Sequence, residues 1–238
     1  MINISSEVTT MIQILLCDDE QNVLSFLSSV IYKHCSHYDC HIQSFTNTLE
    51  AIEASSMCDV CILDIDLPEI NGIELAEQIK ENNKDMLILF YSCKDHLVFD
   101  SFKVHPFDFI RKSESEESVA DKLKRALSQA TQNKLHYLFT KGTETVIIPF
   151  REIIYFYKSF NDLTIRTVNS EYTHRKSLKS LDFPQYFHKV SASLIVNMKF
   201  IKSFDDSSIY LSNNHHFKIG KQKMREFRKH YFQYISTH

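Results

Sequence analysis

The sequence predicts two domains of different fold class: a doubly wound α/β domain with a five-stranded parallel sheet, then a mostly-β domain. In the first half, short apolar runs alternate with segments whose apolar residues recur every three or four positions, as in alternating strands and helices. In the second half, polar turns separate short runs rich in β-branched and aromatic residues. The 238 residues suit two domains of about 100–150 residues each.

Five apolar runs of strand length organise the first half, and amphipathic segments connect them. The clearest helix follows the first run, because its apolar residues form one stripe from Val23 to Ile31. A capping box at Ser113 and Glu116 is expected to begin the last helix. The expected strands are Ile12–Leu16, His41–Phe45, Val60–Leu63, Met86–Tyr91 and Phe107–Ile110, and the other expected helices include Leu49–Ala54, Ile73–Ile79 and a weaker one at Asp95–Val104.

The second half contains mainly strand-like runs, with helical patterns only at Ser177–Leu181 and Lys221–Tyr234. A polar stretch near 128–135 marks the boundary between the halves. We therefore expect a first domain at 11–130, a linker at 131–136 and a second domain at 137–238. The expected strands are Thr145–Ile148, Ile153–Tyr157, Leu163–Val168, Tyr172–Arg175, Val190–Val196, Phe200–Phe204, Ser208–Leu211 and His216–Ile219.

Charge is divided unevenly between the halves. Residues 1–133 carry 10 basic and 22 acidic side chains, a balance of −12, whereas residues 134–238 carry 17 and 8, a balance of +9. A basic module suits a polyanion, because neutralising phosphates releases counterions. The same asymmetry would also let the two halves attract each other. The three glycines argue against a glycine-rich phosphate loop.

Several features predict an intracellular protein that is not in a membrane. No apolar run approaches the ~20 residues of a membrane span, and Met1–Thr10 does not resemble a signal peptide. All six cysteines lie in the first half and are expected to be thiols in a reducing cytoplasm. One cluster leaves a metal site open, although its spacing fits no paired zinc pattern. Its members are His34, Cys35, His37, Cys40 and His41.

Charged and hydroxyl side chains follow four of the five expected strands of the first domain. Asp18 and Asp19 follow the first strand and Asp64 the third, while Ser92 and Lys112 follow the fourth and fifth. The carboxyl ends of parallel strands converge, and ligands bind there. We therefore expect these side chains to form one site.

Three converging carboxylates need a compensating cation, and Mg²⁺ takes carboxylate oxygens while keeping other positions for water and phosphate. We expect Asp19 and Asp64 to bind the metal directly, Asp18 directly or through water, and the backbone carbonyl of Asp66 to complete the set. The Asp64 carboxylate is then suited to attack phosphorus in line, because phosphoryl transfer depends mainly on positioning and charge. The Lys112 ammonium would supply positive charge and the Ser92 hydroxyl a hydrogen bond.

These segments resemble the motifs of response-regulator receiver domains, which have a flavodoxin-like fold. The similar segments are 16–20 (LCDDE), 64–72 (DIDLPEING), 90–92 (FYS) and 108–112 (DFIRK), and the resemblance covers about residues 11–130. It implies that a sensor histidine kinase phosphorylates Asp64, that Ser92 then moves towards the phosphoryl group, and that Phe109 turns inward as a switch. Ser113 stands where the family often has proline, which affects only the local turn.

The second half resembles the LytTR DNA-binding domain over about residues 137–235. The segments that carry this resemblance are 152–156 (EIIYF), 187–197 (FHKVSASLIVN) and 217–221 (FKIGK). The resemblance implies loops that contact double-stranded DNA, dimers on direct repeats, and a role in peptide quorum sensing, bacteriocin production or virulence. Ala192 stands where the family commonly has a long polar residue, so it cannot make a bidentate base contact.

Other polar residues must therefore supply the expected DNA contacts. Some are expected to fix the protein on phosphates and others to recognise bases. The candidates are Lys158, Asn161, Lys189, Ser191, Ser193, Lys218 and Lys221. The resulting hypothesis is a transcription regulator, not an enzyme, that forms a homodimer when Asp64 is phosphorylated.

Two alternatives remain open from the sequence. Asp64 and Asp66 also form the Asp-x-Asp pair of haloacid-dehalogenase-type phosphatases, although that family places its nucleophile after the first strand. Sustained turnover of small phosphomonoesters would favour this enzyme. A receiver with a protein-interaction output module is the other alternative, and salt-dependent binding to duplex DNA would argue against it.

Overall fold

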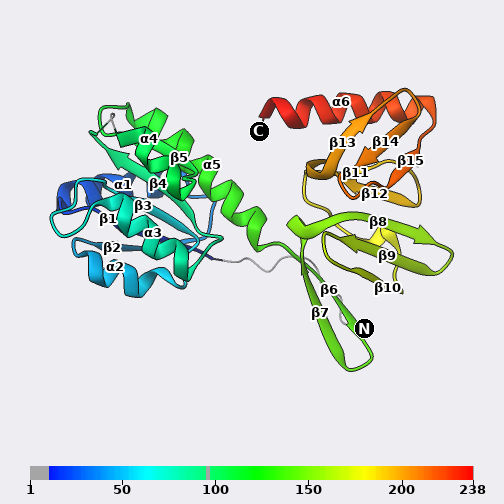
Figure 1. Ribbon diagram of the computed structural model, residues 1–238, viewed down its shortest axis with the longest axis horizontal. Helices are drawn as coiled ribbons and strands as arrows, with labels where there is room; N and C mark the ends of the chain where they lie inside the picture. Colours follow the sequence, from blue (N-terminus) through cyan, green and yellow to red (C-terminus); the bar gives the residue numbers. More distant parts are fainter. Residues whose placement is uncertain (1–10, 95–96, 238) are drawn as a thin grey trace. The chain divides into compact units, whose positions relative to one another are not determined.

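The computed structural model describes residues 11–94 and 97–237, so the signal-peptide prediction for Met1–Thr10 lies outside the described residues. The chain divides into two compact units, the first ending at Gln132 and the second beginning at Asn133. Figure 1 shows the α/β first unit and the strand-rich second unit. Within the described part of the chain, no helix combines the length and apolar character needed to cross a membrane.

The first unit contains the predicted parallel sheet, with strand order β2-β1-β3-β4-β5. All four neighbouring pairs are parallel. The strands are β1 (Ile12–Cys17), β2 (Cys40–Phe45), β3 (Val60–Leu63), β4 (Leu87–Ser92) and β5 (Asp108–Arg111). Every residue of β3 is buried, as expected for a central strand that helices cover on both faces. The prediction of a doubly wound α/β fold is confirmed.

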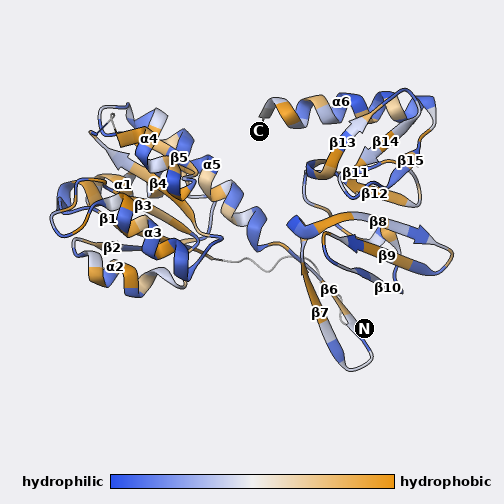
Figure 2. Ribbon diagram, viewed as in Figure 1, coloured by the Kyte–Doolittle hydropathy of each residue, from blue (hydrophilic) through white to orange (hydrophobic). Residues whose placement is uncertain are grey.

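Helices cover the two faces of this sheet. One core cluster joins the sheet to α1 (Gln21–His34) and α5 (Glu116–Lys134), and a second joins it to α2 (Thr48–Ser55) and α3 (Gly72–Asn82). Figure 2 shows hydrophobic colour concentrated in the central strands of the sheet, between the helices. Asparagine side chains cap α2 and α3 by accepting backbone N–H bonds.

Two expectations for the first unit were wrong in detail. The helix expected at Asp95–Val104 is reduced to α4 (Val98–Ser101) and the 3₁₀ turn η2 (Phe102–Val104), and residues 95–96 lie outside the described part. The capping box at Ser113 and Glu116 does not form. Glu116 is the first residue of α5 and pairs with α1, while the Ser115 hydroxyl accepts the Ser118 N–H at 3.3 Å.

The second unit is mostly β, as predicted. A hairpin of β6 and β7 precedes a five-stranded antiparallel sheet in the order β10-β9-β8-β12-β11 and a three-stranded sheet of β13, β14 and β15, and helix α6 ends the unit. The bounds are β6 (His136–Lys141), β7 (Glu144–Pro149), η3 (Phe150–Glu152), β8 (Ile153–Ser159), β9 (Asp162–Thr167), β10 (Glu171–Arg175), η4 (Leu178–Ser180), β11 (Phe187–Lys189), β12 (Leu194–Asn197), η5 (Met198–Phe200), β13 (Ile201–Phe204), β14 (Ser208–Leu211), β15 (His216–Lys218) and α6 (Lys221–Thr237).

The larger sheet of this unit is covered on both faces. One core cluster contains Phe156 and the β6–β7 hairpin, and another contains Tyr155, the three-stranded sheet and α6. In Figure 2, hydrophobic and hydrophilic residues alternate along α6, as expected for a helix with one buried stripe. Because both faces are covered, all four residues of the run Ile153–Phe156 are buried. A register shift between β8 and β9 occurs within this run.

Two expected segments differ in the second unit. Only the end of the strand expected at Val190–Val196 is a strand, β12; residues 190–193 form a loop, and the preceding strand β11 (Phe187–Lys189) was not predicted. The helix expected at Ser177–Leu181 is only the 3₁₀ turn η4. Within the expected linker at 131–136, α5 continues to Lys134 and β6 begins at His136.

Candidate functional site

The carboxyl ends of three parallel strands bring the predicted acidic residues and the lysine together. Asp18 follows β1, Asp64 follows β3 and Lys112 follows β5. The Lys112 Nζ lies 2.8 Å from Asp18 Oδ2 and 2.7 Å from Asp64 Oδ2. One carboxylate oxygen from each of Asp18, Asp19 and Asp64 lies within 4.8 Å of the other two.

The backbone around Asp64 holds its carboxylate in place. Asp64 Oδ1 accepts the N–H of Ile65 at 2.6 Å and that of Asp66 at 3.3 Å, while Oδ2 faces Lys112. The loop then returns to β3, because the N–H of Gly72 donates to the Ile65 carbonyl at 2.9 Å. A Cβ on Gly72 would lie only 1.9 Å from the Asp64 carbonyl oxygen, so glycine is required for this close approach.

Charge in the site is only partly compensated by the protein. Burial raises the pKa of Asp18, which is 2% exposed, and the hydrogen bond from Lys112 acts in the opposite direction. Burial alone would lower the pKa of Lys112, but hydrogen bonds to Asp18 and Asp64 raise it above the ordinary lysine value. Lys112 therefore stays charged beside three carboxyl groups, Asp19 among them. One ammonium against three carboxyl groups leaves negative charge for a hard divalent cation, so the donor set fits Mg²⁺.

The remaining predicted residues surround this cluster. Ser92 ends β4 and is fully buried, and its hydroxyl accepts the Lys94 N–H at 3.3 Å. Asp66 is exposed, and its carboxylate pairs with Lys94 Nζ at 3.1 Å. Phe109, on β5, is half-buried and packs against Phe90 with ring centroids 6.4 Å apart. Glu20 was not predicted, and its carboxylate lies 3.9 Å from Lys112 Nζ.

The histidine and cysteine cluster left open as a metal site does not come together. Among the residues with described positions, the one group of three or more possible metal ligands is the aspartate cluster. The three histidines have different partners, whereas Cys35 and Cys40 belong to or pack against one core cluster. His34 pairs with Glu116, Cys35 is buried in a core, the His37 ring lies against Tyr38, Cys40 is half-buried in β2, and His41 bonds to Gln13.

In the second unit, two loops with predicted DNA contacts lie at one end of the larger sheet. The Lys158 N–H donates to the Ser193 carbonyl at 2.7 Å, which joins the end of β8 to the 190–193 loop. Asn161 follows in the β8–β9 turn and is exposed. Ser191 Oγ lies 3.3 Å from Ser193 Oγ and accepts the Ser193 N–H at 3.2 Å. Lys189 is exposed at the end of β11.

The predicted contacts at the end of β15 and the start of α6, Lys218 and Lys221, are exposed and flank a buried residue. Ile219 lies between Lys218 and Lys221 in the sequence and shares a core cluster with Val190 and Leu194, which flank the 190–193 loop. The structure thus connects all three segments with predicted DNA contacts. Phe160 was not singled out from the sequence, but its side chain is 98% exposed in the β8–β9 turn.

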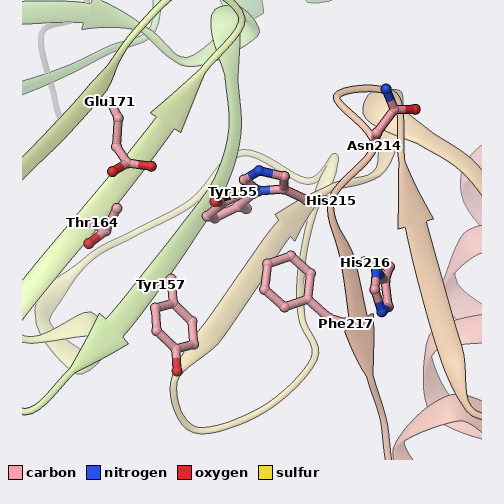
Figure 3. Close-up of a pocket in the computed structure, with 8 residues that line it drawn as sticks. All are labelled: Tyr155, Tyr157, Thr164, Glu171, Asn214, His215, His216 and Phe217. Carbon is pink, nitrogen blue, oxygen red and sulfur yellow. Dashed lines mark hydrogen bonds between the residues drawn. The ribbon is translucent and has the colours of Figure 1, made fainter.

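A shallow groove separates β15 from the β8–β9–β10 face of the larger sheet (Figure 3). Its volume is about 460 Å³. The Tyr155 hydroxyl is hydrogen-bonded to His215 Nδ1 at 2.9 Å, and the Tyr157 and Phe217 rings stack with centroids 6.4 Å apart. These contacts fix β15 and the preceding His215 against β8.

A flavodoxin-like parallel sheet with an acidic cluster and a lysine at its strand ends defines the class of response-regulator receivers. The receiver-domain family model matches residues 14–124, and the LytTr DNA-binding-domain model matches residues 143–232. The chain therefore belongs to the response regulators that carry a LytTR DNA-binding domain. These families associate the first unit with a sensor kinase and the second with DNA.

Curated relatives resemble the chain over most of its length. It is 24% identical to the sensory transduction protein LytR of Streptococcus mutans, covering 91% of this chain and 98% of that protein. It is 25% identical to the sensory transduction protein LytT of Bacillus subtilis, covering 81% and 85%. It is also 24% identical to the transcriptional regulatory protein LytR of Staphylococcus aureus, covering 90% and 96%.

Proposed function

We propose that phosphorylation of Asp64 by a sensor histidine kinase increases binding of the second unit to specific DNA and so regulates transcription. The observation that carries this proposal is the position of Lys112, within 2.8 Å of both Asp18 and Asp64. Residues far apart in the sequence form an acidic site around one ammonium, as phosphoryl transfer to a carboxylate requires. The proposed functional domains are 11–130 and 137–238.

In the proposed transfer, an Asp64 carboxylate oxygen forms a bond to phosphorus as the bond from phosphorus to an imidazole nitrogen of the kinase breaks. The leaving nitrogen takes up a proton. Asp18, Asp19, Asp64 and the Asp66 carbonyl would hold Mg²⁺, which supplies positive charge to the phosphoryl oxygens when bound. Lys112 supplies a second positive charge, and Ser92 donates a hydrogen bond to the new phosphoryl group.

The proposed switch acts through Ser92 and Phe109 on the face formed by α4 and β5. Phosphorylation shifts a two-state equilibrium, as Ser92 moves towards the phosphoryl group and Phe109 turns further inward. Phe99 and Phe102 support an interface there, because they are 79% and 56% exposed. A second copy of the chain would cover them and form the homodimer.

The proposed DNA surface comprises the β8–β9 turn, the 190–193 loop and the segment 218–221, from the end of β15 to the start of α6. Lysines would fix the protein on phosphates, whereas Asn161 and the serines are suited to base edges. Dimers would then occupy direct repeats in a promoter. A cytoplasmic role in peptide quorum sensing, bacteriocin production or virulence completes the proposal.

The first test is intact-mass analysis of the full chain with acetyl phosphate and Mg²⁺. We expect an 80 Da adduct that Asp64→Asn abolishes, together with dimerisation of the phosphorylated wild type in size-exclusion chromatography. Absence of the adduct would refute the proposal. Sustained release of phosphate from small phosphomonoesters would instead favour the phosphatase alternative.

The second test is selection of bound duplexes from a random DNA pool with the phosphorylated full chain. We expect a repeated motif and an affinity that falls steeply with salt, because lysine contacts release counterions. Affinity independent of salt, with no enriched motif, would favour a protein-interaction output module.

A further inference from the structure

The turn between β8 and β9 presents an aromatic ring that the fold does not use. Phe160 is 98% exposed, and its φ of 49° lies in the left-handed region that non-glycine residues seldom adopt. A fully exposed phenyl ring gains nothing from burial. Glycine would adopt this φ more readily, so neither backbone geometry nor packing explains a phenylalanine here.

The surroundings of this ring match a nucleic-acid surface. Lys158 lies two positions before Phe160 and Asn161 directly follows it (Figure 1 shows the β8–β9 connection). The Lys158 N–H is bonded to the Ser193 carbonyl, so the serine loop lies at the same end of the sheet. Residues 134–238 carry a net charge of +9, which attracts a polyanion to this unit.

The shape of the turn indicates which groove it would enter. Ser159 pairs with Asp162, so only Phe160 and Asn161 lie beyond the last cross-strand pair. A two-stranded ribbon fits the major groove of B-DNA, which is about 12 Å wide, and not the minor groove of about 6 Å. In the major groove, the one apolar feature of a base edge is the C5-methyl group of thymine.

We propose that Phe160 is a specificity-determining residue of the DNA-binding unit and that its ring contacts the methyl group of a thymine in the major groove. This inference rests on the proposed DNA surface. It assigns apolar recognition to the turn, at a surface where Ala192 offers no long polar side chain. Because Phe160 carries no charge, its contribution is to sequence preference and not to phosphate binding.

The test compares phosphorylated full-length wild type and Phe160→Ala on the duplex selected from the random pool. We expect the variant to bind this duplex about 5- to 20-fold more weakly, while its affinity for scrambled DNA and its salt dependence stay unchanged. Phe160→Gly, which relieves the positive φ, should lose the same affinity, whereas Phe160→Leu should retain part of it. Ile147→Ala is the matched control, since Ile147 is 60% exposed on β7 of the same unit and should have no effect.

Thymine-to-uracil replacement identifies the partner of the ring. Removing the critical methyl group should weaken wild-type binding about 3- to 5-fold and leave Phe160→Ala binding unchanged. Equal uracil effects in both proteins, or equal losses on selected and scrambled DNA, would overturn the assignment. Loss of self-association with unchanged DNA affinity would place the ring between two copies of the chain and also overturn it. A pool without any enriched motif would refute both the proposed function and this inference, whereas an enriched motif insensitive to Phe160 would refute this inference alone.

Discussion

Replacing Gly72 by alanine tests whether close backbone packing positions Asp64, the proposed phosphoacceptor. The added Cβ would lie 1.9 Å from the Asp64 carbonyl oxygen and 2.8 Å from both the Asp64 carbonyl carbon and the Ile65 Cα. All three are backbone atoms, so no side-chain rotation relieves the clash. Either the start of α3 or the end of β3 must move.

The cost of this movement follows from packing. Insertion of a methyl group into a close-packed site typically costs about 1–3 kcal/mol. Alanine is favoured over glycine in a helix by up to about 1 kcal/mol, so the observed loss of stability understates the clash. We expect Gly72→Ala to lower the free energy of unfolding of the first unit by about 1–3 kcal/mol. We also expect slower phosphorylation of Asp64, by about tenfold or more, because small displacements of reacting groups are costly.

The stability of each unit within the full chain is measured by urea unfolding, with hydrogen exchange as the readout. The adduct formed with acetyl phosphate is measured by intact mass. Gly220→Ala is the control, since a Cβ at Gly220 meets no atom within 4 Å, and it should change neither quantity. A Gly72→Ala protein with wild-type stability and wild-type phosphorylation would refute the reasoning.

Three further predictions concern buried or partly buried polar groups, each measured by urea unfolding. Burial lowers the pKa of His188 to about 4, so the unfolded chain binds its proton first and stability falls as the pH drops from 6.5 towards 4; His188→Leu should weaken this pH dependence. Although burial alone would raise the pKa of Glu114, hydrogen bonds from a backbone N–H and from Lys122 lower it to about 2, so its stabilisation is present above pH 4.5, is lost towards pH 2, and should be absent in Glu114→Gln. The amide of Asn197 is buried, donates to the Ile153 carbonyl at 2.8 Å and accepts a backbone N–H at 3.0 Å, so Asn197→Ala should cost about 2–4 kcal/mol. An unchanged pH profile for either charged-group variant, or a stable Asn197→Ala, would contradict these explanations.

The acidic site could be predicted from the sequence because topology places its residues. In a parallel sheet, residues that directly follow different strands meet at one edge whatever their separation along the chain. Asp18, Asp64 and Lys112 therefore needed only correctly identified strands to be placed together. The apolar runs identified those strands, because both faces of the sheet are covered and hydrophobicity is continuous along them.

The 190–193 loop could not be predicted from hydrophobicity. Val190 and Leu194 are both buried in the same cluster on either side of it, so the apolar pattern continues across the break. The serines between them turn the chain through hydrogen bonds to each other, which a pattern of apolar positions does not contain. Strand β6 (His136–Lys141) was also not predicted. It begins two residues after α5 ends at Lys134, next to the stretch that was expected to be a linker.

The proposed DNA surface depends on a different kind of information from the acidic site. Its side chains lie on turns, where exposure and direction follow from local φ angles and not from strand order. The hydrogen bond between Lys158 and Ser193 is formed by backbone groups and not by side chains. The amino-acid types at these positions therefore do not reveal that the two segments meet. Phe160 shows the consequence most clearly: in the sequence it resembles a core residue, yet its position beyond the last β8–β9 pair exposes it almost completely. If the proposed DNA surface is correct, we expect base preference to depend on side chains that the turns expose, including apolar ones.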